Sequence, residues 1–264
     1  MGYYSNKIAW ITGASSGIGE EFAHQLAKEG ATLILSARSV DKLEKLKNTL
    51  PGSNHMVLPL DLVEYGNFPE LAAQVIQHFG RIDLLVNNGG LSQRSKTVET
   101  SLDIDHYIMN VNYFGNIALT KAVLPYFQKQ GGGQIITISS VAGKFGFYLR
   151  SAYAASKSAV IGFYESLAIE EEDNGIKVTI AVPGKINTPI SMSALNSKGE
   201  KHGVMDHNQE TGMSAEDCVR KILKAAEKNK REVLVGNREI LGVYLKRFLP
   251  QRLFWKIMKK QSAT

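Results

Sequence analysis

The feature that most constrains the fold of this chain is residues 12–19, which read Thr-Gly-Ala-Ser-Ser-Gly-Ile-Gly. Residues 7–11 form an apolar run of strand length, and apolar residues recur at helical spacing over residues 18–27. A strand, a tight glycine turn and an amphipathic helix therefore follow one another. Glycine lets a ligand come close to the backbone there, and the free N–H groups that open the helix suit a diphosphate. A plain strand-to-helix turn is the alternative interpretation.

Further along the chain, short apolar runs alternate with amphipathic stretches. The spacing predicts strands at residues 31–37, 55–60, 82–86, 134–139 and 177–182, and helices at residues 39–50, 67–79, 105–129 (two successive patterns) and 151–173. This alternation is typical of an α/β fold with a doubly wound parallel sheet. Ligands bind such sheets beyond the carboxyl ends of the strands, so the polar and glycine residues that follow the strands should converge. Those residues are 12–19, Arg38, Asp61, 87–90, Ser139, Ser140, Pro183 and Gly184.

Composition excludes several classes of protein. With 264 residues, of which 44% are hydrophobic and 21% charged, the chain resembles an ordinary globular protein. Its single cysteine, Cys218, excludes an internal disulfide framework and a cysteine zinc site. No apolar run approaches the roughly 18 residues of a membrane span, and residues 1–7 lack a secretory apolar region. We therefore expect a cytoplasmic protein.

The net charge of +6 belongs to the end of the chain. Residues 241–264 hold six basic residues and no acidic one, while the other 240 residues hold 25 of each sign. This balance argues against a general nucleic-acid-binding surface. Apolar residues in the same tail form two short faces separated by Pro250, a pattern typical of an interfacial helix pair on anionic lipid. A tail docked on its own domain or on a partner subunit is the alternative.

Tyr153 and Lys157 are candidates for acid–base chemistry. They lie four residues apart, on one face of a predicted helix whose first turn opens at the ligand edge. A phenol with a pKa of about 10 needs about 4 kcal/mol of help to ionise at neutral pH. An ammonium about 4 Å away supplies roughly that energy at an effective dielectric of about 20. The pair could therefore act as an acid or a base.

Two further kinds of polar residue are candidates for the site. A hydroxyl at Ser139 or Ser140, at the end of a predicted strand, could hydrogen-bond a substrate oxygen, although either serine could instead cap the following turn. Asn112 falls within a predicted helix, where asparagine is unfavourable unless its side chain makes a specific bond. A local bond to the backbone is the alternative for Asn112.

Together these motifs resemble the short-chain dehydrogenase/reductase family. The matching residues are Thr12-Gly-x-x-x-Gly-x-Gly19, Asn87-Asn-Gly-Gly90, Ser140, Tyr153-x-x-x-Lys157, Pro183-Gly184 and Thr188. They match in type, order and spacing, and a helix at residues 215–228 and a strand at 233–236 fit the family's last elements. The resemblance implies a Rossmann-like sheet of about seven strands in a three-layer sandwich. It also implies that residues 1–240 are a single dinucleotide-binding catalytic domain.

The resemblance implies a role for each matching residue. Tyr153 would exchange a proton with the substrate oxygen, and Lys157 would lower its pKa and hold the nicotinamide ribose. Ser140 would orient the carbonyl, and Asn112 would hold a water that relays protons. No metal is implied. The implied cofactor-binding residues are Gly13, Ser15, Ser16, Gly17, Ile18, Gly19, Arg38, Asp61, Asn88, Gly89, Tyr153, Lys157, Pro183, Gly184, Ile186 and Thr188.

The choice of cofactor can be argued from the end of the second strand. Family members that use NAD usually place an acid there, for the ribose 2′-hydroxyl. Here residues 36–39 read Ser-Ala-Arg-Ser, and the guanidinium of Arg38 can form a forked contact with a 2′-phosphate. We therefore expect NADP(H). The family resemblance further implies that Asp61 lies near the adenine and Asn88 near the adenosine ribose. Arg38 as a solvated surface charge is the alternative.

Residues 185–214 lack periodicity and are expected to form a loop over the substrate. The loop contains His202 and His207, the latter beside Asp206, so a metal site is conceivable, although a solvated pair is the favoured interpretation. Aromatic residues cluster at 145–148 and favour an apolar substrate. A packed loop explains these aromatic residues equally well.

These patterns favour an NADP(H)-dependent oxidoreductase that interconverts a carbonyl and a secondary alcohol on an apolar or lipid-like substrate. The resemblance implies a homodimer or homotetramer, and the tail predicts peripheral membrane contact through residues 241–260. The alternative is a dinucleotide-sensing or scaffold protein that has kept the fold and lost turnover. Intact Ser140 and Asn112 argue against that alternative, because a mere binder needs neither of them.

Overall fold

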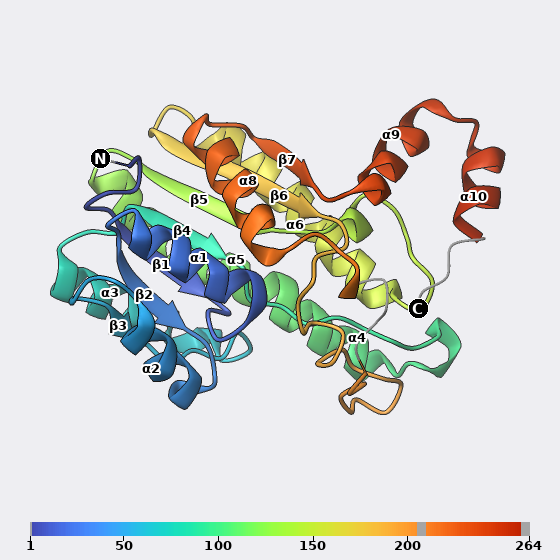
Figure 1. Ribbon diagram of the computed structural model, residues 1–264, viewed down its shortest axis with the longest axis horizontal. Coiled ribbons are helices and arrows are strands. Elements are labelled where there is room, and N and C mark those ends of the chain that lie inside the picture. The colour runs from blue at the N-terminus through green and yellow to red at the C-terminus, as the bar shows by residue number, and fades with distance from the viewer. Residues whose placement is uncertain (1, 205–209, 260–264) are drawn as a thin grey trace.

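The computed structural model describes residues 2–204 and 210–259, within which seven strands form one sheet (Figure 1). The order across the sheet is β3-β2-β1-β4-β5-β6-β7, and every pairing is parallel. This arrangement confirms the predicted doubly wound fold. The strands are β1 (Ile8–Thr12), β2 (Thr32–Ser36), β3 (Met56–Val57), β4 (Leu84–Asn87), β5 (Gly133–Ile138), β6 (Ile176–Pro183) and β7 (Glu232–Val235).

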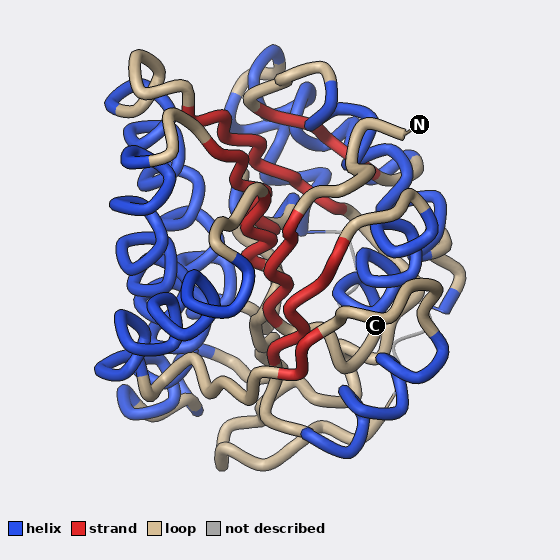
Figure 2. Tube along the Cα trace, turned by 90° about the vertical axis from the view of Figure 1, so that its left-hand side faces the viewer, coloured by secondary structure: helices blue, strands red, loops and turns tan. Residues whose placement is uncertain are grey.

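Helices cover both faces of the sheet, so the fold is the predicted three-layer sandwich (Figure 2). Successive side chains of a strand point to opposite faces, so Trp10 packs beneath one helical layer and Ile11 beneath the other. Because both faces are buried, the strands are continuous hydrophobic runs. One layer contains α1 (Gly17–Lys28), α2 (Val40–Thr49) and α8 (Ala215–Glu227), and the other contains α3 (Phe68–Phe79), α4 (Leu102–Met109), α5 (Gly115–Lys129) and α6 (Ser151–Glu170).

The predicted boundaries differ from the structure in two places. The third strand, expected over residues 55–60, is reduced to Met56–Val57 at the edge of the sheet. The two helical patterns expected within residues 105–129 are continuous, because the π-helical turn η3 (Asn110–Phe114) joins α4 to α5. Such a turn widens the helix and often marks a functional site. It contains Asn112, whose side chain is fully buried.

The crevice that positions the site lies where the sheet changes its direction of growth. Strand β1 pairs with β2 on one side and with β4 on the other, so the ends of β1 and β4 meet at a switch point. The N–H groups of Asn88 and Gly89 each donate to Thr12 Oγ1 at 3.0 Å, and Asn88 Nδ2 donates to the Thr12 carbonyl at 3.0 Å. These bonds join the turn after β1 to the turn after β4, and residues of both turns line the same cleft.

The tail forms two short helices beside the layered body, α9 (Leu241–Phe248) and α10 (Gln251–Lys259) (Figure 1). Phe254 attaches the tail: it is buried and meets Phe145 edge to face, with 5.5 Å between the ring centroids. Gly242 allows α9 to approach the same ring, since a Cβ there would lie 2.8 Å from Phe145 Cζ. The alternative of a tail docked on its own domain therefore holds for this contact.

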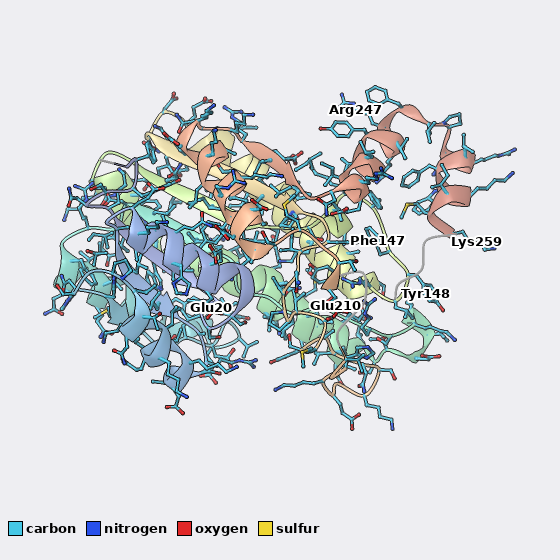
Figure 3. All side chains as sticks on the ribbon, viewed as in Figure 1. Glu20, Phe147, Tyr148, Glu210, Arg247 and Lys259 are labelled. Atoms are coloured by element: carbon cyan, nitrogen blue, oxygen red, sulfur yellow. The ribbon has the colours of Figure 1, made fainter. Side chains whose placement is uncertain are left out.

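Much of the tail faces outward. Arg247 and Lys259 lie on the side away from the sheet (Figure 3), and Lys260 lies outside the described residues. None of the helices in the described part of the chain is long and apolar enough to cross a membrane. Large apolar side chains of the tail that remain exposed are Leu241, Tyr244, Leu245, Phe248, Leu253 and Trp255.

A buried polar network ties α6 to the sheet. Asn87 Nδ2, at the end of β4, donates to the Tyr164 hydroxyl of α6 and to Thr120 Oγ1 of α5, each at 2.8 Å. The two hydroxyls are themselves 2.6 Å apart. Because α6 also carries Tyr153, this network determines where that helix lies along the ligand edge.

Removing the Tyr164 hydroxyl should measure the strength of this network. Tyr164→Phe leaves Asn87 and Thr120 each short of a buried partner, so we expect the free energy of unfolding to fall by about 1–3 kcal/mol in urea titration. Tyr65→Phe, which removes a hydroxyl from an exposed ring, should change it by less than about 0.5 kcal/mol. Equal losses in the two variants would contradict the assignment.

Candidate active site

A cleft of about 340 Å³ opens at the carboxyl edge of the sheet, over the switch point. It brings together residues from the glycine turn, from the ends of four other strands and from the start of α6. Of the predicted site residues, those that line it are Gly13, Ser15, Ser16, Gly17, Ile18, Arg38, Asp61, Asn88, Gly89, Ser140, Tyr153, Lys157, Pro183, Gly184, Ile186 and Thr188. Gly19 and Asn112 are not among its lining residues.

The glycine turn forms a backbone cradle. Gly13 and Gly17 have left-handed φ angles of +65° and +59°, which favour glycine. A Cβ on Gly13 would lie 2.8 Å from Asn88 Nδ2, and one on Gly17 would lie 3.1 Å from Thr188 Cβ. A Cβ on Gly19 would overlap the Gly13 carbonyl, so close packing requires glycine there, and the expected contact of Gly19 with the cofactor stays a prediction. The bare cradle at the start of α1 fits a diphosphate.

The end of the cleft beyond β2 is rich in hydrogen-bond donors. Arg38, Ser39 and Lys42 all line it, and Asp61 lines it from the segment after β3. The Arg38 side chain is exposed, and its Nη1 donates to the Tyr107 hydroxyl on α4 at 3.5 Å. Two cations and a hydroxyl at this end suit an anionic group.

Tyr153 lies in the first turn of α6, and Ser140 follows β5. Both residues line the cleft, and Ser140 Oγ accepts the N–H of Ala142 at 3.2 Å. Ser140 therefore caps the following turn, and its bond to a substrate oxygen stays a prediction. Burial raises the pKa of Tyr153, while the charge of Arg150 and the neighbouring Ser140 hydroxyl oppose that rise.

Lys157 follows Tyr153 by one turn on α6, and its side chain is buried. Its Nζ donates to the Ile138 carbonyl at 2.8 Å and lies 5.9 Å from the centroid of the Tyr153 ring. Burial lowers the pKa of Lys157 to about 8. Burial is the largest influence on the pKa of Tyr153, and the lowering by Lys157 that the family resemblance implies stays a prediction. The charge that acts on Tyr153 in that direction is Arg150, whose Cζ lies 5.8 Å from the ring centroid.

Asn112 is held by contacts distant in sequence, so the alternative of a local backbone bond is wrong. Its Oδ1 accepts the N–H of Leu91 at 2.7 Å, and its Nδ2 donates to the Leu91 carbonyl and to Ser156 Oγ, each at 2.9 Å. A Cβ built on Gly90 would lie 3.0 Å from Asn112 Oδ1 and 3.4 Å from Lys157 Nζ. The bare glycine thus leaves a polar space between these two groups.

The aromatic residues expected near the substrate lie in the loop between β5 and α6 and do not line the cleft. Phe145 and Phe147 stack with 4.9 Å between centroids, so the packed-loop interpretation holds for them, while Tyr148 is exposed (Figure 3). His202 is described, but His207 and Asp206 lie outside the described residues. Within the part of the chain that the structure describes, no three potential ligands form a metal-binding group.

One group of residues at this edge escaped sequence reasoning. Ser92, Gln93, Arg94 and Ser95 are all buried, although they are polar and lie in a loop. Gln93 Oε1 accepts the N–H groups of Ala152 and Tyr153. The available signal was four consecutive polar residues immediately after the turn at 87–90, where ligand contacts were already expected.

Comparison with known proteins identifies the family. Residues 7–199 match the short chain dehydrogenase family, and the chain belongs to it. A Drosophila melanogaster dehydrogenase/reductase SDR family protein 7-like is 39% identical over 264 residues, which cover 97% of this chain and 81% of that protein. The chain is thus an oxidoreductase of the short-chain dehydrogenase/reductase family.

Solved structures agree with this assignment. A short chain dehydrogenase/reductase from Burkholderia phymatum, in complex with NAD, has a TM-score of 0.81 at 22% identity, covering 100% of this chain and 98% of that one. An alcohol dehydrogenase from Thermococcus sibiricus, complexed with 5-hydroxy-NADP, has a TM-score of 0.76 at 28% identity, covering 88% and 97%. The family fold therefore binds a nicotinamide dinucleotide.

Proposed function

We propose that this protein is an NADP(H)-dependent oxidoreductase that interconverts a carbonyl and a secondary alcohol on an apolar or lipid-like substrate. The observation that carries the proposal is that Ser140 and Tyr153 line the same cleft as the glycine cradle, with the Ser140 hydroxyl near enough to the phenol to oppose the rise in its pKa. Lys157 lies close to the same ring. This set of groups can orient an oxygen and exchange a proton with it.

The chemistry divides between cofactor and protein. The nicotinamide, when bound, supplies a hydride to the carbonyl carbon or accepts one from the alcohol carbon. In reduction, the Tyr153 phenol donates its proton to the substrate oxygen, and the raised pKa of Tyr153 keeps that proton available. The Ser140 hydroxyl orients the oxygen. Lys157 Nζ and Asn112 Oδ1, which border the space over Gly90, would hold the ribose and a proton-relaying water.

The preference for NADP(H) is supported by the donors beyond β2. Arg38 lies just beyond the end of β2, and Lys42 lines the same end of the cleft. A forked guanidinium and an ammonium can neutralise a 2′-phosphate, whereas an acid would be needed to select the free 2′-hydroxyl. Asp61 and Asn88 would contact the adenosine.

Assembly and location are further parts of the proposal. We expect a homodimer or homotetramer, because Phe114 of η3 and Ile169 of α6 expose apolar side chains on the long helices. We also expect peripheral contact with anionic membranes through residues 241–260 of a cytoplasmic protein. The exposed apolar residues of α9 and α10, interleaved with basic ones, support this contact.

The competing function is a dinucleotide sensor or scaffold without turnover. The presence of Ser140 beside Tyr153 in the cleft and the buried, long-range contacts of Asn112 favour the enzyme, because dinucleotide binding by itself requires neither. NADPH oxidation against a panel of carbonyl compounds separates the two. A wild-type protein that binds NADPH but is inert on every carbonyl would establish the sensor.

Replacing Tyr153 by phenylalanine should abolish turnover. Tyr153→Phe removes the proton donor and keeps the ring, so we expect kcat to fall by at least about 100-fold with NADPH affinity nearly unchanged. The matched control is Tyr148→Phe, at an exposed position on the preceding loop. Full activity in Tyr153→Phe would refute the proposed role.

Reversing the charge at Arg38 should change the cofactor preference. Arg38→Asp removes the forked contact and repels a 2′-phosphate, so we expect the NADPH/NADH ratio of kcat/KM to fall by about 10–100-fold. Lys45→Asp makes a charge reversal on the exposed face of α2, away from the lining residues, and should leave the ratio unchanged. An unaltered ratio in Arg38→Asp would sink the NADP(H) assignment.

Membrane contact can be tested by co-sedimentation with phosphatidylcholine vesicles that contain or lack phosphatidylserine. We expect the full chain to pellet only with the anionic vesicles, less so at high salt, and the Phe248→Ser, Trp255→Ser double variant to remain in solution. Val98→Ser with Leu102→Ser, which removes exposed apolar side chains elsewhere, is the control. Equal pelleting of the wild type and the tail variant excludes the tail as the contact.

A further inference from the structure

The buried polar loop after β4 lies between two parts of the site. The backbone of Ser92 and Arg94 pairs with Leu195 of the expected substrate loop, through bonds of 2.9 and 2.8 Å. On the other side, the Ser95 N–H donates to the Leu149 carbonyl, just before α6, at 3.2 Å. The loop therefore bridges the substrate loop and the helix that carries Tyr153.

The side chain of Gln93 makes the connection to α6. It is fully buried, and its Oε1 accepts the N–H of Ala152 at 2.8 Å and the N–H of Tyr153 at 3.4 Å. Its Nε2 donates to Ser95 Oγ and to Thr100 Oγ1, each at 3.2 Å. Both ends of the amide are thus used, so its orientation is determined by its partners.

These two N–H groups are ones that a helix cannot satisfy by itself. Ala152 and Tyr153 are the second and third residues of α6, whose first N–H groups have no partner within the helix. A side chain at the N-cap normally accepts them, but Arg150 occupies that position and makes no such cap bond. Gln93 performs the capping from about 60 residues away in sequence.

We propose that Gln93 is a positioning residue for Tyr153: it caps α6 from outside the helix and thereby fixes the first turn, where the phenol lies. The inference rests on the proposed catalytic role of Tyr153. Removing the cap leaves two buried N–H groups without an acceptor, which loosens the turn. Small displacements of a reacting group cost large factors in rate, so the effect should appear in kcat.

The same segment gives the cap a second consequence. Gln93 is paired with Leu195 through the backbone bridge, so the substrate loop and the N-terminus of α6 share one support. A displacement of the backbone at Leu195 would move Gln93, and through the side chain of Gln93 it would move the first turn of α6, which contains Tyr153. The placement of the acid is therefore linked to the order of the loop that covers the substrate.

The test compares the same substitution at two buried glutamines. Gln93→Met keeps the length of the side chain and removes its acceptor. Gln134→Met does the same on β5, where Gln134 is buried, donates to the Ala226 carbonyl at 2.8 Å and does not line the cleft. Gln93→Glu restores an acceptor for both N–H groups. Each variant is measured by hydrogen exchange at residues 151–155 with NADPH bound, and by kcat and KM with the best carbonyl of the panel.

We expect amide exchange at residues 152 and 153 to accelerate by about 10-fold or more in Gln93→Met, and kcat to fall by about 10–100-fold with the KM for NADPH within about 2-fold. Gln93→Glu should restore most of the protection from amide exchange and most of kcat, and Gln134→Met should change neither quantity. Unchanged exchange in Gln93→Met, or equal losses in Gln134→Met, overturns the proposal. If Gln93→Met does not fold, Gln93→Asn replaces it in the test, because its side chain is one methylene shorter and its acceptor lies further from α6. The same changes in amide exchange and kcat are then expected. A protein inert on every carbonyl would defeat the proposed function, while exchange alone would still decide the capping.

Discussion

The site depends on the contact between the ends of β1 and β4. Thr12 accepts two N–H groups from the turn after β4, and Asn88 returns a bond to the Thr12 carbonyl. The contact is possible because β1 is the strand from which the sheet grows in both directions, so two loops distant in sequence face each other there. The cradle, the floor of the cleft and the backbone beneath Lys157 and Asn112 all take their positions from it.

Helix α6 is held at several places by hydrogen bonds to groups of other elements. Tyr164 joins Asn87 and Thr120 in its middle, Ser139 Oγ donates to the carbonyl of Lys157, and Gln93 holds its first turn. The helix that carries the proposed acid is thus fixed by polar contacts at specific points as well as by apolar packing. Buried polar contacts of this kind fix one orientation more strictly than side chains that merely fill volume.

Much of this architecture could be predicted from the sequence. Alternating apolar runs indicated the parallel sheet, and residues that follow strands had to meet at one edge, so the polar and glycine residues after the strands could be placed in the lining of the cleft. The structure was needed where a property depends on three-dimensional surroundings. The spacing predicts that Lys157 lies on the same helix face as Tyr153. It predicts neither the bond from the Lys157 ammonium to the Ile138 carbonyl nor the burial that lowers the pKa of Lys157. Gln93 escaped because a cap supplied by another segment has no local pattern.

The buried ammonium of Lys157 has a consequence for the lifetime of the protein. Burying a cation costs free energy, which the bond to the Ile138 carbonyl offsets in part and the oxygen atoms of a bound ligand would offset further. Dinucleotide binding should therefore stabilise the native state through mass action, by an amount that grows with the ratio of free ligand to its dissociation constant. The abundance of this protein in a cell would then follow the supply of its cofactor, because the unliganded chain unfolds more often and is degraded more readily.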